Sequence, residues 1–130
     1  MNAVDTNIII RFLTGDDARQ FKKAFSIFNS EEIFITATVV QETEWVLRFA
    51  YKFPPEAICS ALEKLFGMKN VHLSSPETFA QAINWYRHGM DFSDALHLSQ
   101  CQQLDKLFTF DKKLIAKAKN LTECFVTLPA

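Results

Sequence analysis

Four acidic residues of this chain stand where a carboxylate is costly unless it is paired or bound to a cation. Each follows or interrupts an apolar run, and they are Asp5, Glu42, Asp94 and Asp111. Carboxylates brought close together repel, and the repulsion forces some of them to stay protonated. A bound divalent cation removes that repulsion. The four acids therefore predict a metal site that is built from segments distant in the sequence.

The ligand type indicates which metal and which chemistry. Carboxylate oxygens favour Mg²⁺, with Mn²⁺ as a second possibility, over zinc, and neither CxxC, HxH nor HExxH spacing occurs. Such acids with one or two Mg²⁺ ions suit hydrolysis of a phosphodiester, because the metal lowers the pKa of an attacking water and stabilises charge on the attacking and leaving oxygens. The chain has three glycines and no GxxxxGK, so no loop is expected to cradle a nucleoside triphosphate.

The segments that carry these acids alternate between strand and helix patterns. We predict strands at 2–5, 33–36, 71–73, 107–110 and 124–126. The helical patterns cover about 6–14, 17–28, 39–51, 56–66, 75–87, 93–104 and 112–119. At 130 residues the chain has the size of one domain. The alternation implies an α/β fold, with residues 1–130 forming a single domain around a mostly parallel central sheet flanked by helices.

This layout places the acids near one edge of the predicted sheet. Asp5 and Asp111 each end a predicted strand, Glu42 lies in the first turns of the helix after strand 33–36, and Asp94 opens another helix. Ligands of parallel sheets bind beyond the carboxyl ends of the strands, so we expect all four acids at one edge. Taken singly, Asp5 and Asp111 could instead cap the following helices, and Asp94 could be an acid of a first helical turn.

Two of the four acids have another acidic residue nearby that could take the functional role instead. Helical periodicity places Glu42 on the stripe of Val39 and Val46, which should face inward, while Glu44 lines up with Arg48 as an exposed i,i+4 pair. We therefore predict a functional role for Glu42 and a surface role for Glu44. Near the later helix, Asp91 is placed to cap its start, and Asp94 is the functional candidate.

Composition restricts the other functions. The formal net charge of −1 argues against a broad basic surface, yet without the four acids 11 acidic residues face 14 basic ones. The lysines of 112–119 directly follow Asp111, so they are either a solvated helix face or a contact for a nucleic-acid backbone. The three cysteines are expected to be buried free thiols. With no signal-like start and no apolar run near ~20 residues, a cytoplasmic location and no membrane contact are expected.

Four segments together resemble the PIN-domain ribonucleases, and within them the VapC toxins of bacterial type II toxin–antitoxin modules. The segments are 4–7 (VDTN), 39–47 (VVQETEWVL), 91–97 (DFSDALH) and 109–111 (TFD), in order along essentially the whole chain. The resemblance implies a Mg²⁺-dependent endoribonuclease toxin that cleaves structured RNA, either tRNA or rRNA. It also implies a homodimer silenced by a VapB-type antitoxin, with DNA contacted only through that antitoxin.

The resemblance also assigns roles to individual residues. It places the catalytic acids on Asp5, Glu42, Asp94 and Asp111, and it makes Asp5 and Asp94 the metal ligands. Small polar residues of the same segments would support the acids or a metal-bound water; these are Thr6, Asn7 and Thr109.

Two other interpretations remain open at this point. A phosphatase of the haloacid-dehalogenase type also begins with an aspartate after an amino-terminal strand. That chemistry needs a second aspartate two positions later, where this chain has Asn7. A non-catalytic PIN-like interaction module is the second alternative. Such modules usually lose acids, whereas all four remain here.

Overall fold

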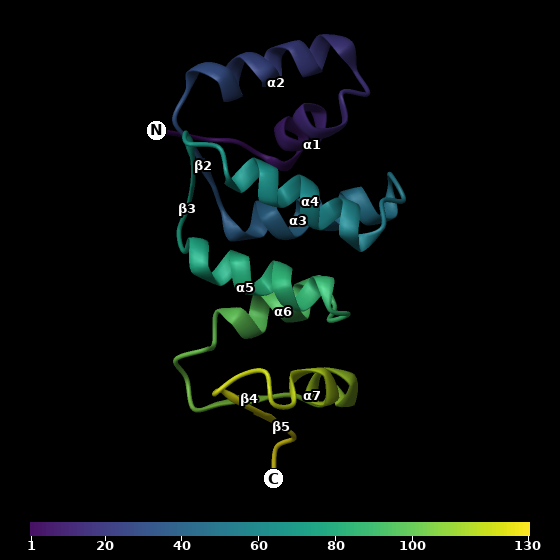
Figure 1. The fold of residues 1–130 in the computed structure, drawn as a ribbon, viewed down its shortest axis with the longest axis vertical. Coiled ribbons are helices and arrows are strands. Elements are labelled where there is room, and N and C mark those ends of the chain that lie inside the picture. Colours follow the sequence, from purple (N-terminus) through teal and green to yellow (C-terminus); the bar gives the residue numbers. More distant parts are fainter. The chain divides into compact units, whose positions relative to one another are not determined.

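The computed structural model describes residues 1–130, and it has the predicted α/β character (Figure 1). The chain divides into two compact units, Met1–Pro76 and Glu77–Ala130, which are described in turn. No helix is long and apolar enough to pass through a bilayer.

Unit 1 is built on a three-stranded parallel sheet. Its strands are β1 (Asn2–Ala3), β2 (Ile33–Ile35) and β3 (Val71–Leu73), in the order β1-β2-β3. Parallel neighbours need a long crossover, and two helices supply each one. The crossover from β1 to β2 contains α1 (Thr6–Thr14) and α2 (Ala18–Ser30), and that from β2 to β3 contains α3 (Ala37–Phe49) and α4 (Pro55–Phe66). The parallel arrangement predicted from the alternating patterns is confirmed in this unit.

Local sequence signals account for the helix ends of unit 1. Asp17 caps α2 by accepting a hydrogen bond from the Gln20 amide at 2.9 Å, and Thr36 caps α3. Gly15 ends α1 with φ of 63°, a left-handed conformation that glycine adopts without steric cost. Pro55 opens α4, where the missing amide proton costs no hydrogen bond. Each of these ends follows from the residues beside it.

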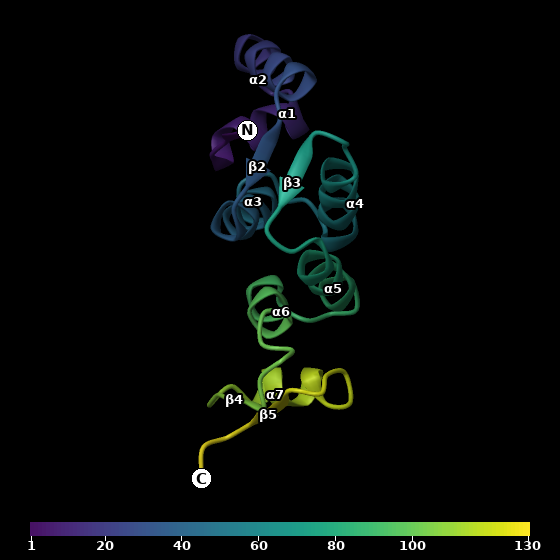
Figure 2. The same ribbon diagram turned by 90° about the vertical axis from the view of Figure 1, so that its left-hand side faces the viewer.

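The core of unit 1 lies between its sheet and its helices. β2 contributes Ile33 and Ile35, both fully buried, and α3 and α4 contribute Leu47 and Ile58. Figure 2 shows β2 and β3 side by side, and α4 packs against β3. The β-branched residues that predicted strand β2 are therefore the ones that the helices cover.

Unit 2 is a smaller α/β arrangement. It contains α5 (Pro76–Arg87, which starts at the last residue of unit 1), α6 (Phe92–Ser99) and α7 (Lys112–Ala118). Its strands β4 (Lys106–Phe108) and β5 (Phe125–Thr127) are parallel neighbours, and α7 is the crossover between them. The strands of the protein thus pair as two parallel sheets, one in each unit.

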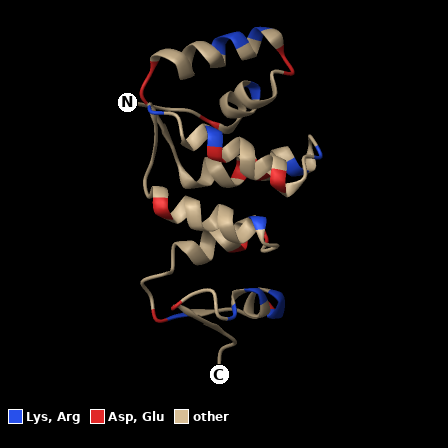
Figure 3. Ribbon diagram, in the orientation of Figure 1, with Lys and Arg blue, Asp and Glu red and all other residues tan.

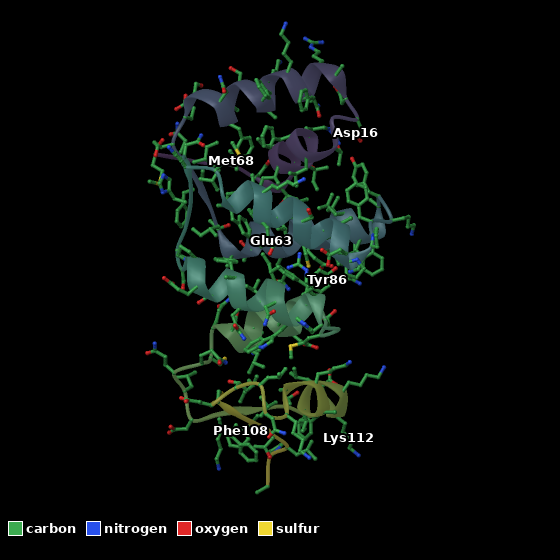
Figure 4. The ribbon with its side chains drawn as sticks, in the orientation of Figure 1. Asp16, Glu63, Met68, Tyr86, Phe108 and Lys112 are labelled. Atoms are coloured by element: carbon green, nitrogen blue, oxygen red, sulfur yellow. The ribbon has the colours of Figure 1, made fainter.

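Two predicted elements of unit 2 end earlier than expected. The helix at 93–104 was expected to carry Cys101 and Leu104, but α6 ends at Ser99, and Leu104 is 59% exposed. The chain forms successive tight turns instead, with the Leu104 amide bonded to the Cys101 carbonyl at 2.9 Å. The strand predicted at 107–110 stops at Phe108, which is exposed (Figure 4). Phe110 cannot continue it because the backbone turns there toward α7.

Candidate functional site

Unit 1 has a recess beyond the carboxyl ends of β1 and β2. We call it the Asp5 recess; it has a volume of about 250 Å³ and is lined by Asp5, Thr6, Asn7, Glu42, Trp45 and Val46. Asp5 follows β1 and caps α1 by accepting a hydrogen bond from the Ile8 amide at 3.3 Å. Glu42 comes from α3, which follows β2. Two of the predicted acids therefore come together in this unit, as their positions after parallel strands predict.

Thr6 holds the Glu42 carboxylate in this recess. The Thr6 side chain is 5% exposed, and its hydroxyl donates a hydrogen bond to Glu42 Oε1. A buried hydroxyl with one acceptor fixes the carboxylate position more tightly than solvent does. Asn7 lines the same recess and is exposed. The placement of Thr6 agrees with a supporting role, and the functional assignment of both residues stays a prediction.

The predicted helical phase of α3 is wrong. Glu42 is exposed, whereas Glu44 is only 1% exposed and lies on the buried face with Thr43 and Leu47. The predicted ion pair does form, with Arg48 Nε donating to Glu44 Oε2 at 2.7 Å, but its carboxylate is buried. Polar residues fit this buried face because their hydrogen bonds are satisfied locally; the Thr43 hydroxyl, for example, donates to a backbone carbonyl at 2.7 Å.

Glu42→Gln should therefore affect mainly activity, and Glu44→Gln should affect mainly stability. Glu42→Gln should leave the free energy of unfolding within about 0.5 kcal/mol, as for an exposed residue, and lower RNA cleavage at least ~10-fold. Glu44→Gln should lower the free energy of unfolding by roughly 1–3 kcal/mol, because it weakens a charged hydrogen bond whose acceptor is buried. Urea unfolding together with a cleavage assay tests both. A Glu44→Gln protein as stable as the parent would contradict the structural role.

Unit 2 has a second recess, between α6 and α7. We call it the Asp94 recess; it has a volume of about 450 Å³ and is lined by Gly89, Met90, Asp91, Asp94, Asp111, Lys113, Leu114 and Lys117. Asp91 caps α6 by accepting a hydrogen bond from the Asp94 amide at 3.1 Å, which confirms its predicted capping role. The two predicted acids of unit 2 come together here with Asp91 as a third carboxylate.

The environment of Asp94 disfavours its charged form. Partial burial raises the pKa of the Asp94 carboxyl, and the nearby carboxylates of Asp91 and Asp111 raise it further. His97 acts in the opposite direction. A cation bound among these oxygens would offset both the repulsion and the desolvation. Carboxylate oxygens are the ligands that Mg²⁺ and Mn²⁺ prefer, so the chemical type of these donors fits such an ion, although the carboxylates of this recess do not gather closely enough to hold it by themselves.

Asp94→Asn should stabilise the metal-free protein at neutral pH. Because the folded-state pKa of Asp94 is raised, its ionised form opposes folding, at full strength above that pKa and not at all below the unfolded-state pKa of ~3.9. The melting temperature in EDTA should thus rise at pH 7, and the gain should vanish as the pH falls through this window. Asp105→Asn, which removes an exposed acid outside the recess, is the matched control. A gain equal at pH 7 and at low pH would contradict the electrostatic cause.

Capping and site roles coincide at Asp111. Its Oδ1 accepts hydrogen bonds from the Lys113 and Leu114 amides at 2.9 and 3.2 Å, so it caps α7 while it lines the recess. The Asp111 amide in turn donates to Thr109 Oγ1 at 3.0 Å. The predicted supporting residue Thr109 therefore fixes the backbone that carries Asp111. Asp5 and Asp111 thus do cap helices, as the alternative interpretation predicted. Both also line a recess, so capping does not exclude a functional role.

The structure places each predicted site residue within its own unit. Asp5 and Glu42 share one recess, and Asp94 and Asp111 share the other. Within neither unit do three or more His, Cys, Asp or Glu side chains gather closely enough to hold a metal ion by themselves. The meeting of all four acids at one centre stays a prediction.

Several residues line the recesses that sequence reasoning did not place beside the four acids. They are Trp45 in the Asp5 recess and Asp91, Lys113 and Lys117 in the Asp94 recess. The lysines had a signal, because they lie four residues apart in the helix that follows Asp111. Trp45 is 55% exposed and lies on the outward face of α3. The helical phase predicted for α3 could not place it at the recess, because that phase is wrong.

Comparisons with known proteins give a family match and a similar solved structure. The model of the PIN domain family matches residues 3–120. Among solved structures, the chain is similar to VapC20 of Mycobacterium tuberculosis, described as a toxin that cleaves the sarcin-ricin loop. The two are 20% identical, the match covers 89% of this chain and 94% of that one, and the TM-score is 0.43. No curated protein sequence matches the chain.

Proposed function

We propose that this chain, which belongs to the PIN domain family, is a metal-dependent endoribonuclease that acts as the toxin of a type II toxin–antitoxin module. The family match spans nearly the whole chain and agrees with the family that the four acidic segments resemble. A nuclease function is what the family membership supports. The metal, the RNA substrate and the toxin role are the further steps of the proposal.

The observation that carries the proposal is the crowding of carboxylates in the Asp94 recess. Asp94 is half-buried beside Asp91 and Asp111, and the pKa of its carboxyl is raised by desolvation and by both neighbours. A favourable interaction with the start of α6 could also place an acid at Asp94, but it leaves the repulsion from Asp91 and Asp111 and the desolvation uncompensated. Binding of a divalent cation would compensate both. This argument favours a nuclease over a non-catalytic module.

Each acid has a distinct part in the proposal. Asp5 and Asp94 would be the ligands of Mg²⁺ or Mn²⁺. Glu42 and Asp111 would add further negative charge to the catalytic site. When bound, the metal would activate a water and stabilise charge on the phosphodiester. The Thr6 hydroxyl holds the Glu42 carboxylate in position, and the backbone amides of α7 hold that of Asp111. These contacts keep the carboxylates in place before the metal arrives, which lowers the cost of reorganisation.

The proposal includes two protein partners. Several large apolar side chains are exposed, among them Trp45, Phe49 and Phe25. Trp45 and Phe49 contact each other with ring centroids 5.1 Å apart, and Arg48 lies over the Phe49 ring. Exposed aromatic groups of this kind are typical of interfaces. We infer a homodimer that also binds a VapB-type antitoxin. Light scattering that finds a monomer at micromolar concentration would remove the dimer.

The proposed function is tested by RNA cleavage and by growth. Purified protein should cut a structured tRNA or rRNA fragment in Mg²⁺, and expression of the chain should arrest bacterial growth. Co-expression of the protein encoded beside it should restore growth if that protein is the antitoxin. A phosphatase would instead release phosphate from a small monoester, so the same preparation should be assayed with one. Monoester turnover without RNA cleavage would overturn the proposal.

A further inference from the structure

Two lysines lie in the Asp94 recess together with its carboxylates. Lys113 and Lys117 are four residues apart on α7, so they share a helix face, and both line the recess. Figure 3 shows how strongly basic α7 is. The other two lysines of this segment, Lys112 and Lys119, do not line the recess. The segment therefore carries one pair of ammonium groups beside the acids and a second pair elsewhere.

The first pair is not neutralised by the carboxylates beside it. Neither Lys113 nor Lys117 takes part in an ion pair. The Asp111 carboxylate is engaged instead with backbone amides at the start of α7. Two cations that share a recess with three acids, yet pair with none of them, keep their charge available for an anionic ligand.

Gly89 makes room for one of these cations. Its φ is 106°, a conformation that L side chains rarely adopt. A Cβ built at this position would lie 3.2 Å from the Lys117 Nζ, closer than most Cβ contacts. The absent side chain therefore leaves room for the ammonium group beside residue 89 at the recess wall. The recess of about 450 Å³ is within the range of ligand sites and can take a phosphodiester group.

We propose that Lys113 and Lys117 hold a phosphate group of the RNA strand beside the scissile bond. This inference rests on the proposed function and adds the contact that places the substrate. A phosphodiester brings negative charge to a site that is already rich in carboxylates, so substrate binding needs cations from the protein as well as from the metal. The two lysines are positioning residues, and their loss should act on substrate binding more than on the chemical step.

The test compares two double variants with the same change in charge on the same segment. K113A/K117A removes the lysines of the recess, and K112A/K119A removes the other pair. With a structured RNA in Mg²⁺, KM should rise roughly 10-fold for K113A/K117A, with kcat within about threefold, while K112A/K119A should match the parent within about twofold. K113R/K117R, which keeps both charges, should restore most of the binding. Melting curves check that every variant is folded.

A second measurement does not depend on cleavage. In an Asp5→Asn background, RNA affinity is measured at several salt concentrations. Loss of the contact to this one phosphate should reduce the slope of log K against log salt by about 0.7, because each neutralised phosphate of a single strand contributes ~0.7. K112A/K119A should leave the slope unchanged.

The possible outcomes separate this inference from the function beneath it. Equal losses in the two double variants, or a slope unchanged in K113A/K117A, would overturn the assignment. An unchanged slope would also result if the lysines bind an acidic protein partner rather than RNA. If the slope falls as expected but the parent never cleaves RNA, the nuclease proposal fails while the phosphate contact stands.

Discussion

Asp5→Asn and Asp94→Asn should each lower RNA cleavage about a thousandfold and abolish toxicity in bacteria, while the protein stays folded. Each change removes a charged ligand of the proposed metal site, and a metal contributes several kcal/mol of charge stabilisation, where ~1.4 kcal/mol is tenfold in rate. Single-turnover cleavage at fixed Mg²⁺ and growth after induction measure the two effects.

Asp5 also caps a helix, and this second role provides the control for its substitution. Asp5 caps α1 through Oδ1, and asparagine caps a helix about as well as aspartate, so Asp5→Asn should preserve the helix start. Asp5→Ala, which loses both functions, should in addition cost about 1 kcal/mol of unfolding free energy. Circular dichroism and urea unfolding separate the two substitutions. An Asp5→Asn protein that cleaves RNA like the parent would remove Asp5 from the site.

The double variant tests whether the two recesses serve one reaction. If Asp5 and Asp94 both act on one centre, Asp5→Asn/Asp94→Asn should be no slower than the slower single variant, because residues that act as a unit are strongly non-additive. Independent contributions would instead multiply, giving about a millionfold loss. The cycle therefore examines the predicted meeting of the acids by kinetics alone.

Chelation should stop RNA cleavage completely, and added Mg²⁺ or Mn²⁺ should restore it. The acids offer hard oxygen ligands, and without a cation they only repel one another. Ca²⁺ should bind but support little turnover, because it takes a larger and less regular coordination shell that holds water and phosphate in poor geometry for in-line attack. RNA cleavage assays after dialysis against EDTA, with each metal added back, measure these effects.

The metal prediction also has an activity-free readout. A divalent cation that binds the folded state should raise the melting temperature of the parent, and the effect should be smaller for Asp94→Asn. Glu44→Gln, which alters a buried acid paired with Arg48 outside both recesses, should keep the full metal-induced shift. Cleavage that persists in excess EDTA, from protein free of contaminating nuclease, would refute the metal mechanism and leave Asp5 and Asp111 as helix caps.

Local sequence determined where the elements begin and end. Asp17, Gly15 and Pro55 set helix boundaries through their own hydrogen bonds and backbone preferences, which act over one or two turns. The strand at Ile33–Ile35 followed likewise from its β-branched and aromatic residues. Because such signals need no distant partner, the alternation of strands and helices, and with it the placement of Asp5 after β1, could be predicted.

Helix faces were decided by tertiary structure. From sequence, Glu42 and Glu44 differ only in helical phase, and the apolar stripe through Val39 and Val46 predicted the wrong one. In the structure the buried face of α3 is the one that packs within unit 1, and it accepts Glu44 because Arg48 neutralises it. Glu42 remains at the recess because Thr6, 36 residues earlier in the chain, bonds to it. No periodicity within α3 contains that information.

Which side chains line each recess could likewise not be predicted in full from the sequence. The acids could be predicted because each follows a strand or opens a helix, whereas Lys113 and Lys117 could not be separated from Lys112 and Lys119 by type or by local pattern. What separates the two pairs is the packing of α7 beside the Gly89 turn and the start of α6. The side chains of a recess are selected by which faces of distant elements meet, and that is set by burial of the whole unit.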